Sequence, residues 1–298
     1  MTLQQLVAAE LDEPVDQRVA RLAAQIAGQY GDAAESVLFY GSCLRQSELD
    51  GLMLDFYVIV SSYSDAYDAR WLAVANALLP PNVFPFEADG LVAKYAVLSR
   101  ADFRRLASSR TRGVSVWARF AQPSRLVWTR DADCREAAID AVAQAAPALL
   151  AAAWEAVPHP VQPLDLWRQA FSLTYGAELR AERKGRAGSV VDADAARYAA
   201  FTGPALALAG IDPDRPVTPA AHRRALRLWR RRRLEGKLLT AARLAKASLT
   251  FANGIDYLAW KINRHAGSAI SITPWQRRWP LLGALTLLPR LLRAGAVR

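Results

Sequence analysis

The stretch VLFYGSCLRQSELDGLMLDFYVIV, residues 37–60, sets the expectation for the fold. Two apolar runs, Val37–Tyr40 and Phe56–Val60, flank a Gly41-Ser42 turn, and Asp55 stands at the head of the second run. Aromatic and β-branched residues favour strands, whereas Gly-Ser favours a turn. The stretch therefore predicts two strands joined by a turn, with one carboxylate close to that turn.

A strand that ends in Gly-Ser and runs into a helix is suited to binding phosphate. Glycine lets the backbone approach the anion, and the amides at the start of a helix point towards it. Ser42 adds a hydroxyl donor, and Asp55 on the neighbouring strand would hold Mg²⁺ against the same phosphates. The alternative is an ordinary strand junction in which Asp55 is an edge-strand aspartate exposed to water.

The elements on either side extend an α/β pattern. Apolar spacing predicts helices over 19–29, 69–79 and 100–109, the second ending at Pro80-Pro81, and strands over 83–86 and 92–98. From about residue 131 the sequence is rich in Ala and Leu and predicts helices, with Pro-rich hinges at 157–165 and 210–222. We interpret the chain as three parts, residues 1–130, 131–250 and 251–298.

Composition favours an anionic partner. The 298 residues carry a net charge of +10, with a pI near 10.0, which fits nucleic acid, acidic lipid or phosphate-bearing ligands. Cys43 and Cys134 lack metal-ligand spacing, which favours a reducing compartment. The N-terminus lacks the pattern of a signal peptide, and no apolar run predicts a transmembrane helix. We therefore expect a peripheral protein at the cytoplasmic face of the cell membrane.

Four segments in order carry a family resemblance: FYGSCLRQ, MLDFYVIV, KYAVLSRADFRRL and VWARFAQPSRLV, followed by LTYGAELRAERKGRAGSVV at 173–191. The Gly-Ser turn and the aspartate resemble the nucleotidyltransferase fold of the DNA polymerase β type, where Gly-Ser precedes Asp-x-Asp. Met53 stands where that pattern has its first Asp. Taken together, the segments resemble the mitochondrial-type CDP-diacylglycerol synthases, the translocator assembly and maintenance family, which also lacks that first Asp.

The resemblance implies an α/β (α+β) chain with a polymerase β-like nucleotidyltransferase domain, then a mostly helical domain and a C-terminal amphipathic membrane-binding helix. It implies a Mg²⁺-dependent phosphatidate cytidylyltransferase that makes CDP-diacylglycerol and pyrophosphate from CTP and phosphatidic acid in phospholipid biosynthesis. Other possibilities are nucleotidyl transfer to a protein or RNA hydroxyl, and an inactive basic scaffold that binds membranes or nucleic acid. The oligomeric state is not predicted.

The resemblance also implies site residues. Asp55 and Lys94 are expected to be catalytic, and Asp55 and Glu87 to bind the metal, because the strand over 83–86 is expected beside 56–60. Alternatives are a structural salt bridge for Lys94 and a turn for Glu87 or Asp89. Cys43 departs from the family, which has Gly there. Expected nucleotide-binding residues are Tyr40, Gly41, Ser42, Cys43, Arg119, Arg180 and Lys184.

The C-terminal segment has the composition of a helix lying among lipid headgroups, because apolar residues there are flanked by Arg and Trp. The alternative is a C-terminal helix packed on the core. An arginine-rich run over 223–233, with further basic residues at Lys237, Arg243 and Lys246, would add attraction to an anionic leaflet. No RNA-binding motif is present, so no nucleic-acid partner is expected. Expected membrane-binding residues are Trp275, Arg277, Arg278, Trp279, Leu285 and Leu288.

Overall fold

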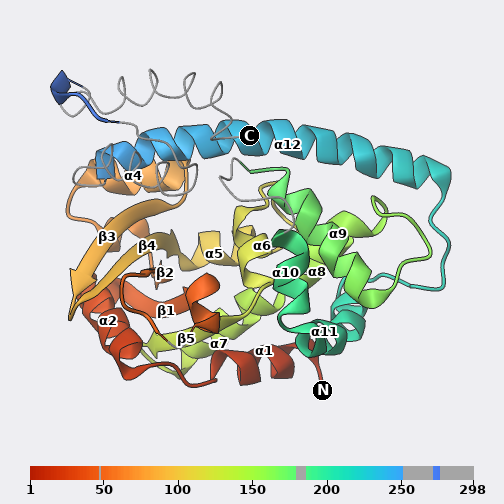
Figure 1. Cartoon of the computed structure of the whole chain (residues 1–298). Coiled ribbons are helices and arrows are strands. Elements are labelled where there is room, and N and C mark those ends of the chain that lie inside the picture. Colours follow the sequence, from red (N-terminus) through yellow and green to blue (C-terminus); the bar gives the residue numbers. More distant parts are fainter. Residues whose placement is uncertain (47, 179–185, 251–270, 276–298) are drawn as a thin grey trace.

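The computed structural model describes residues 1–46, 48–178, 186–250 and 271–275. In that part of the chain a mixed five-stranded sheet is covered by helices (Figure 1). The strand order is β3-β4-β2-β1-β5, with β2 and β4 parallel and the other neighbours antiparallel. The strands are β1 (Ala34–Tyr40), β2 (Met53–Val60), β3 (Asn82–Ala88), β4 (Leu91–Ser99) and β5 (Ser124–Thr129).

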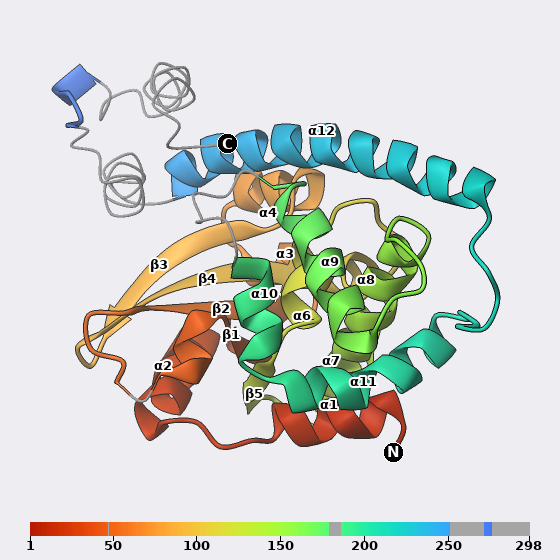
Figure 2. The same ribbon diagram turned by 45° about the vertical axis from the view of Figure 1, so that its right-hand side comes forward.

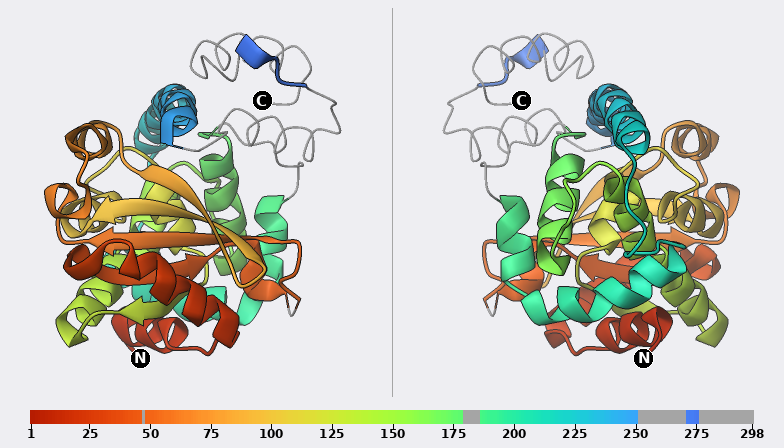
Figure 3. Two further views of the ribbon diagram at one scale, coloured as in Figure 1. Left: turned by 90° about the vertical axis from the view of Figure 1, so that its left-hand side faces the viewer. Right: turned by 90° about the vertical axis from the view of Figure 1, so that its right-hand side faces the viewer.

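Helices account for most of the rest. The long α12 crosses one edge of the molecule in Figure 1 and is seen nearly end-on in both views of Figure 3. The α-helices are α1 (Leu3–Leu11), α2 (Gln17–Gly28), α3 (Tyr63–Ala66), α4 (Arg70–Leu78), α5 (Arg100–Leu106), α6 (Ser115–Phe120), α7 (Ala132–Ala143), α8 (Ala145–Trp154), α9 (Pro163–Tyr175), α10 (Arg186–Asp192), α11 (Ala195–Leu208) and α12 (Pro219–Thr250), and the 3₁₀ turns are η1 (Gly31–Ala33) and η2 (Ser42–Arg45).

Alternation along the strands gives each face of the sheet its own core. Phe56 and Val58 face α2, where Leu22 and Ile26 are buried. Tyr57 and the other side chains on the opposite face of the sheet contact a larger cluster, which is built from α1 and α5 to α12. This larger cluster joins residues before and after position 130, so packing is continuous across that sequence boundary. Most of these helices fill the right-hand and lower parts of Figure 1.

The sequence predicted the mixed α/β class and, between residues 19 and 106, α2, α4, α5 and β1 to β4, with boundaries shifted by a few residues, but it did not predict the short α3 and η1. Two local expectations are wrong. β3 pairs with β4 and not with β2, because β4 runs between them. The Gly-Ser turn runs into the four-residue η2 and not into an α-helix. Asp89 and Gly90, both at positive φ, form the β3–β4 turn, which confirms the turn alternative for Asp89.

One stretch among the described residues, Ala132–Trp154, is long and apolar enough to cross a membrane by length and composition alone. It comprises α7 and α8, and about two thirds of its most apolar window is buried inside the protein. Leu149 and Leu150 lie at the centre of the larger core cluster. Burial in the core accounts for the apolar composition of this stretch.

Candidate functional site

Strand register brings Asp55, Lys94 and Tyr40 into one row. Tyr40 of β1 lies opposite Asp55 of β2, and Asp55 lies opposite Lys94 of β4. Lys94 Nζ is 2.7 Å from Asp55 Oδ1, and the two side chains are 24% and 20% exposed. The salt-bridge alternative for Lys94 is therefore present, and its partner is the predicted metal ligand itself. A half-buried carboxylate paired with one ammonium remains accessible at this end of the sheet.

Gly41 lies directly against the same carboxylate. Its φ of 99° is in a region that residues with a side chain rarely adopt. A Cβ placed on Gly41 would lie 3.2 Å from Asp55 Oδ2. The glycine thus has two reasons to be there: the backbone conformation and the close approach to Asp55. Among the described glycines, only Gly41 lies so close to Asp55 that an added Cβ would come within 4 Å of its carboxylate.

Ser42 and Cys43 begin η2, which is too short to provide the amide-lined helix start that the sequence suggested. Cys43 is buried in the core on the α2 side of the sheet, and its thiol donates to the Met53 carbonyl at 3.4 Å. Burial, and secondarily Asp55, raises the pKa of the Cys43 thiol. The thiol is therefore a packed, neutral side chain, and only the backbone of Cys43 remains for binding a ligand.

Arg119 of α6 lies beneath this row. Its guanidinium donates to Glu178 Oε1 at 3.3 Å and to the Ser115 carbonyl, and it approaches the Tyr40 hydroxyl. Burial disfavours its charge, but Glu178, Tyr57, Tyr40 and Asp55 together outweigh burial, so the pKa of Arg119 lies well above its usual value. Glu178 is 6% exposed and pairs with Arg119. Arg119 is therefore a permanent cation near Asp55.

The structure adds Arg243, which the sequence analysis had placed only in a basic run. Arg243 lies on α12 and donates from Nη1 to Ser115 Oγ at 3.0 Å and from Nε to the Pro80 carbonyl at 2.8 Å. Ser115 Oγ in turn donates to Glu178. No local pattern separates Arg243 from its neighbours in the run, because only the docking of α12 decides which arginine faces inward.

Glu87 occupies a different place from the one expected. It lies opposite Val92 on β4, and Val92 lies opposite Met53, so Glu87 is two strands away from Asp55 and two residues away along the strand direction. Sheet spacing then puts the two Cα atoms about 12 Å apart. Glu87 is also exposed. This placement does not support Glu87 and Asp55 as ligands to one ion.

The residues present fit Mg²⁺ in only one way. Among the described residues no group of three or more His, Cys, Asp or Glu side chains could hold a metal. Mg²⁺ is, however, commonly held by one or two carboxylates together with substrate phosphates and water. Asp55 fits as a single protein ligand for an ion that arrives with a nucleotide.

Several predicted residues fall outside the described ranges. These are two from the basic loop and five from the C-terminal segment: Arg180, Lys184, Arg277, Arg278, Trp279, Leu285 and Leu288. The C-terminal amphipathic helix falls there as well. Trp275 is described, and its side chain is among the exposed large apolar ones at 46%.

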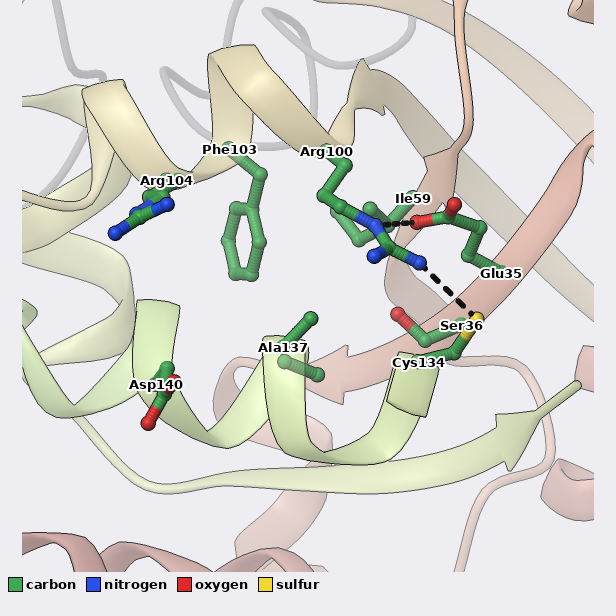
Figure 4. Close-up of a pocket in the computed structure, with 10 residues that line it drawn as sticks. Glu35, Ser36, Ile59, Arg100, Phe103, Arg104, Cys134, Ala137 and Asp140 are labelled. Carbon is green, nitrogen blue, oxygen red and sulfur yellow. Dashed lines mark hydrogen bonds and ion pairs between the residues drawn. The ribbon is translucent and has the colours of Figure 1, made fainter. Parts of the chain in front are cut away.

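A separate cavity of about 180 Å³ lies between α5, α7 and the start of β1 (Figure 4). Arg100 there pairs with Glu35 at 2.6 Å and donates to Cys134 Sγ at 3.3 Å. Glu35 and Tyr40 stand at opposite ends of β1, about 17 Å apart along the strand. None of the predicted site residues lines this cavity, and its main charges neutralise each other.

A scan against protein-family models finds no match for this chain, and no curated protein matches its sequence. The functional argument therefore depends on the motifs quoted above and on the geometry around Asp55.

Proposed function

We propose that the protein is a Mg²⁺-dependent phosphatidate cytidylyltransferase, which transfers CMP from CTP to phosphatidic acid and releases pyrophosphate. The observation that carries the proposal is the Asp55 carboxylate, which lies against the Gly41 backbone and beside the Lys94 ammonium. Asp55 would hold Mg²⁺, and the turn at Gly41-Ser42 would receive the triphosphate. Peripheral binding at the cytoplasmic face of an anionic membrane belongs to the same proposal.

The reaction suits a site rich in cations and poor in bases. An oxygen of the lipid phosphate attacks the α-phosphorus of CTP, the bond from that phosphorus to the β-phosphate oxygen breaks, and pyrophosphate leaves. A phosphate monoester is already anionic near neutral pH, so the attack needs no strong general base. Bound Mg²⁺ would neutralise phosphate charge. Lys94 and Arg119 contribute fixed positive charge, and positioning supplies the remaining rate enhancement.

The test is to incubate the full chain with CTP, Mg²⁺ and vesicles containing phosphatidic acid, and to measure CDP-lipid and pyrophosphate. We expect Asp55→Asn to lower the rate by about 100-fold or more, because the amide is a poor ligand for a divalent cation. Asp65→Asn is the matched control, since Asp65 is exposed and hydrogen-bonds only to nearby serines among the described residues.

The result distinguishes the other functions. Labelled nucleotide that appears on protein or RNA, with none on lipid, would replace this proposal with transfer to a macromolecular hydroxyl. No transfer by the wild-type chain to any acceptor, with vesicle binding intact, would point to a basic scaffold. Equal CDP-lipid synthesis by wild type and Asp55→Asn would remove Asp55 from the mechanism.

A further inference from the structure

Arg243 is anchored to the sheet end by one side of its guanidinium. Its Nε and Nη1 donate to the Pro80 carbonyl and to Ser115 Oγ, and the described part of the chain offers no partner to Nη2. The side chain is half-buried on the inner face of α12. A donor held in this way, with an unused N–H pair, is preorganised to bind an anion.

The charges around Arg243 favour an anion. Arg243 and Arg119 converge on Ser115, and Glu178 is the carboxylate that contacts this group. Burial and then nearby Arg119 lower the pKa of Arg243, although Tyr57 and Glu178 partly offset them. Lys246, one turn further along α12, adds another partly buried basic group. Positive charge therefore exceeds negative charge here among the described residues, and a phosphate would relieve the repulsion.

An anion bound at Arg243 would lie at a different place from the nucleotide. Gly41 and Ser42 lie at the β1 end of the Asp55 row, whereas Arg243 reaches the site from α12 and the Pro80 loop. Tyr57, two residues beyond Asp55, lies within electrostatic range of both Asp55 and Arg243. Two phosphate groups could thus flank Asp55 from different sides, as transfer between two phosphates requires.

The outer surface near Arg243 suits a lipid. Leu234 and Leu238 on the outer side of α12 are 68% and 72% exposed, and the N-terminal half of the helix exposes a row of arginines. Figures 1 and 2 show α4 alongside the C-terminal half of α12. There Trp71, Val74 and Leu78 are exposed at helical spacing. Exposed apolar and basic side chains together match an anionic lipid surface.

We propose that Arg243, positioned by Ser115, binds the phosphate monoester of the lipid acceptor, at a subsite distinct from the one for CTP. The proposal rests on the proposed function and assigns its acceptor side. The guanidinium donates to two phosphate oxygens and leaves a third oxygen to attack the α-phosphorus of CTP. The new phosphorus–oxygen bond replaces the bond to pyrophosphate, and no proton transfer is needed when the acceptor is a dianion.

The test measures the KM for each substrate separately, using a water-soluble short-chain phosphatidic acid so that membrane binding does not contribute. We expect Arg243→Gln to raise the acceptor KM by about tenfold or more, as for the loss of a charge-assisted hydrogen bond, and to leave the CTP KM within about twofold. Arg243→Lys should recover part of the loss. Arg21→Gln, at an exposed position on α2, is the control and should change neither KM.

Two further measurements keep the outcome decisive. Ser115→Ala removes only a hydroxyl and should raise the acceptor KM by a smaller factor; it decides the question if Arg243→Gln does not fold. Calorimetry with short-chain phosphatidic acid alone should show weaker binding to Arg243→Gln than to wild type.

If the wild type binds this lipid through Arg243 but makes no CDP-lipid, the proposed function fails and the subsite stands. If CDP-lipid is made and these variants change the CTP KM, or neither KM, the subsite is overturned.

Discussion

Gly41 and Asp55 work as a pair, because the backbone of one lies against the carboxylate of the other. Only a residue without a side chain combines the φ of 99° with this approach. Lys94, on the opposite side of the carboxylate, holds Oδ1 at 2.7 Å. The orientation of Asp55 is therefore fixed by one glycine and one lysine, on two different chain segments.

Gly41→Ala should damage both stability and activity. We expect a loss of about 1–3 kcal/mol in the free energy of unfolding, because alanine is strained at this φ. The new methyl group would also displace Asp55, so CDP-lipid synthesis should fall by more than the loss of folded protein explains. Urea unfolding and initial rates measure the two effects. Gly51→Ala, which also has positive φ but nothing within 4 Å of its Cβ, separates backbone strain from contact with Asp55.

Lys246 should give the stability a pH dependence. Burial and then Arg243 lower its pKa from 10.5 to about 7. The folded chain loses this proton near pH 7, while the unfolded chain keeps it to about pH 10.5. The unfolded state thus binds more protons between these values, and the contribution of Lys246 to stability rises with pH. Urea unfolding at pH 7 and pH 9.5 should show a smaller rise in Lys246→Met, and an equal rise would contradict the assignment.

At the scale of elements, buried ion pairs join helices that are far apart in sequence. Arg197 of α11 pairs with Glu10 of α1, and both side chains are 7% exposed. Arg197 also donates to the Ala121 carbonyl at 3.0 Å and lies 4.1 Å from the centre of the Phe201 ring. Glu10 accepts from the backbone of Ser124 at the start of β5. One buried pair therefore links α1, α11 and the β5 edge of the sheet.

Arg197→Met should cost about 3–5 kcal/mol of unfolding free energy, because it leaves the Glu10 carboxylate buried without its cation. Adding Glu10→Leu to this variant should restore part of the loss. Equilibrium urea unfolding of the two single variants and the double variant measures the coupling. Arg168→Met is the control, since Arg168 pairs with Asp165 and Asp192 at the surface and should matter little. Equal losses for Arg168→Met and Arg197→Met would contradict this view of the core.

At the scale of the whole molecule, basic and apolar groups gather on the side where α12 and α4 lie. The exposed Leu234 and Trp71 belong to helices from different thirds of the chain, which pack side by side (Figure 2). Lys246 joins them by donating to the Ala75 and Leu79 carbonyls near the end of α4. Under the proposed function, this is the surface that would face an anionic bilayer.

Deleting residues 275–298 should remove most of the binding to vesicles that contain anionic lipid, and it should leave CTP binding unchanged. The segment combines Trp and Arg with an apolar stripe, a composition that favours the membrane interface. Vesicle co-sedimentation and calorimetry with CTP measure the two properties. A truncated chain that sediments with vesicles as well as the full chain does would refute an anchor in this segment.

The sequence by itself determined the mixed α/β class and the strands of the Asp55 row, and it offered the turn between β3 and β4 as an alternative. These features follow from alternating apolar residues and from Gly, Pro and Asp at turns, which act over a few neighbouring residues. The tertiary structure decided that β4 separates β3 from β2, that Glu178 is buried, and that Arg243 faces inward. Those outcomes depend on strand order and on helix docking, in some cases between segments more than 100 residues apart. Burial and charge pairing are decided only when such distant surfaces come into contact.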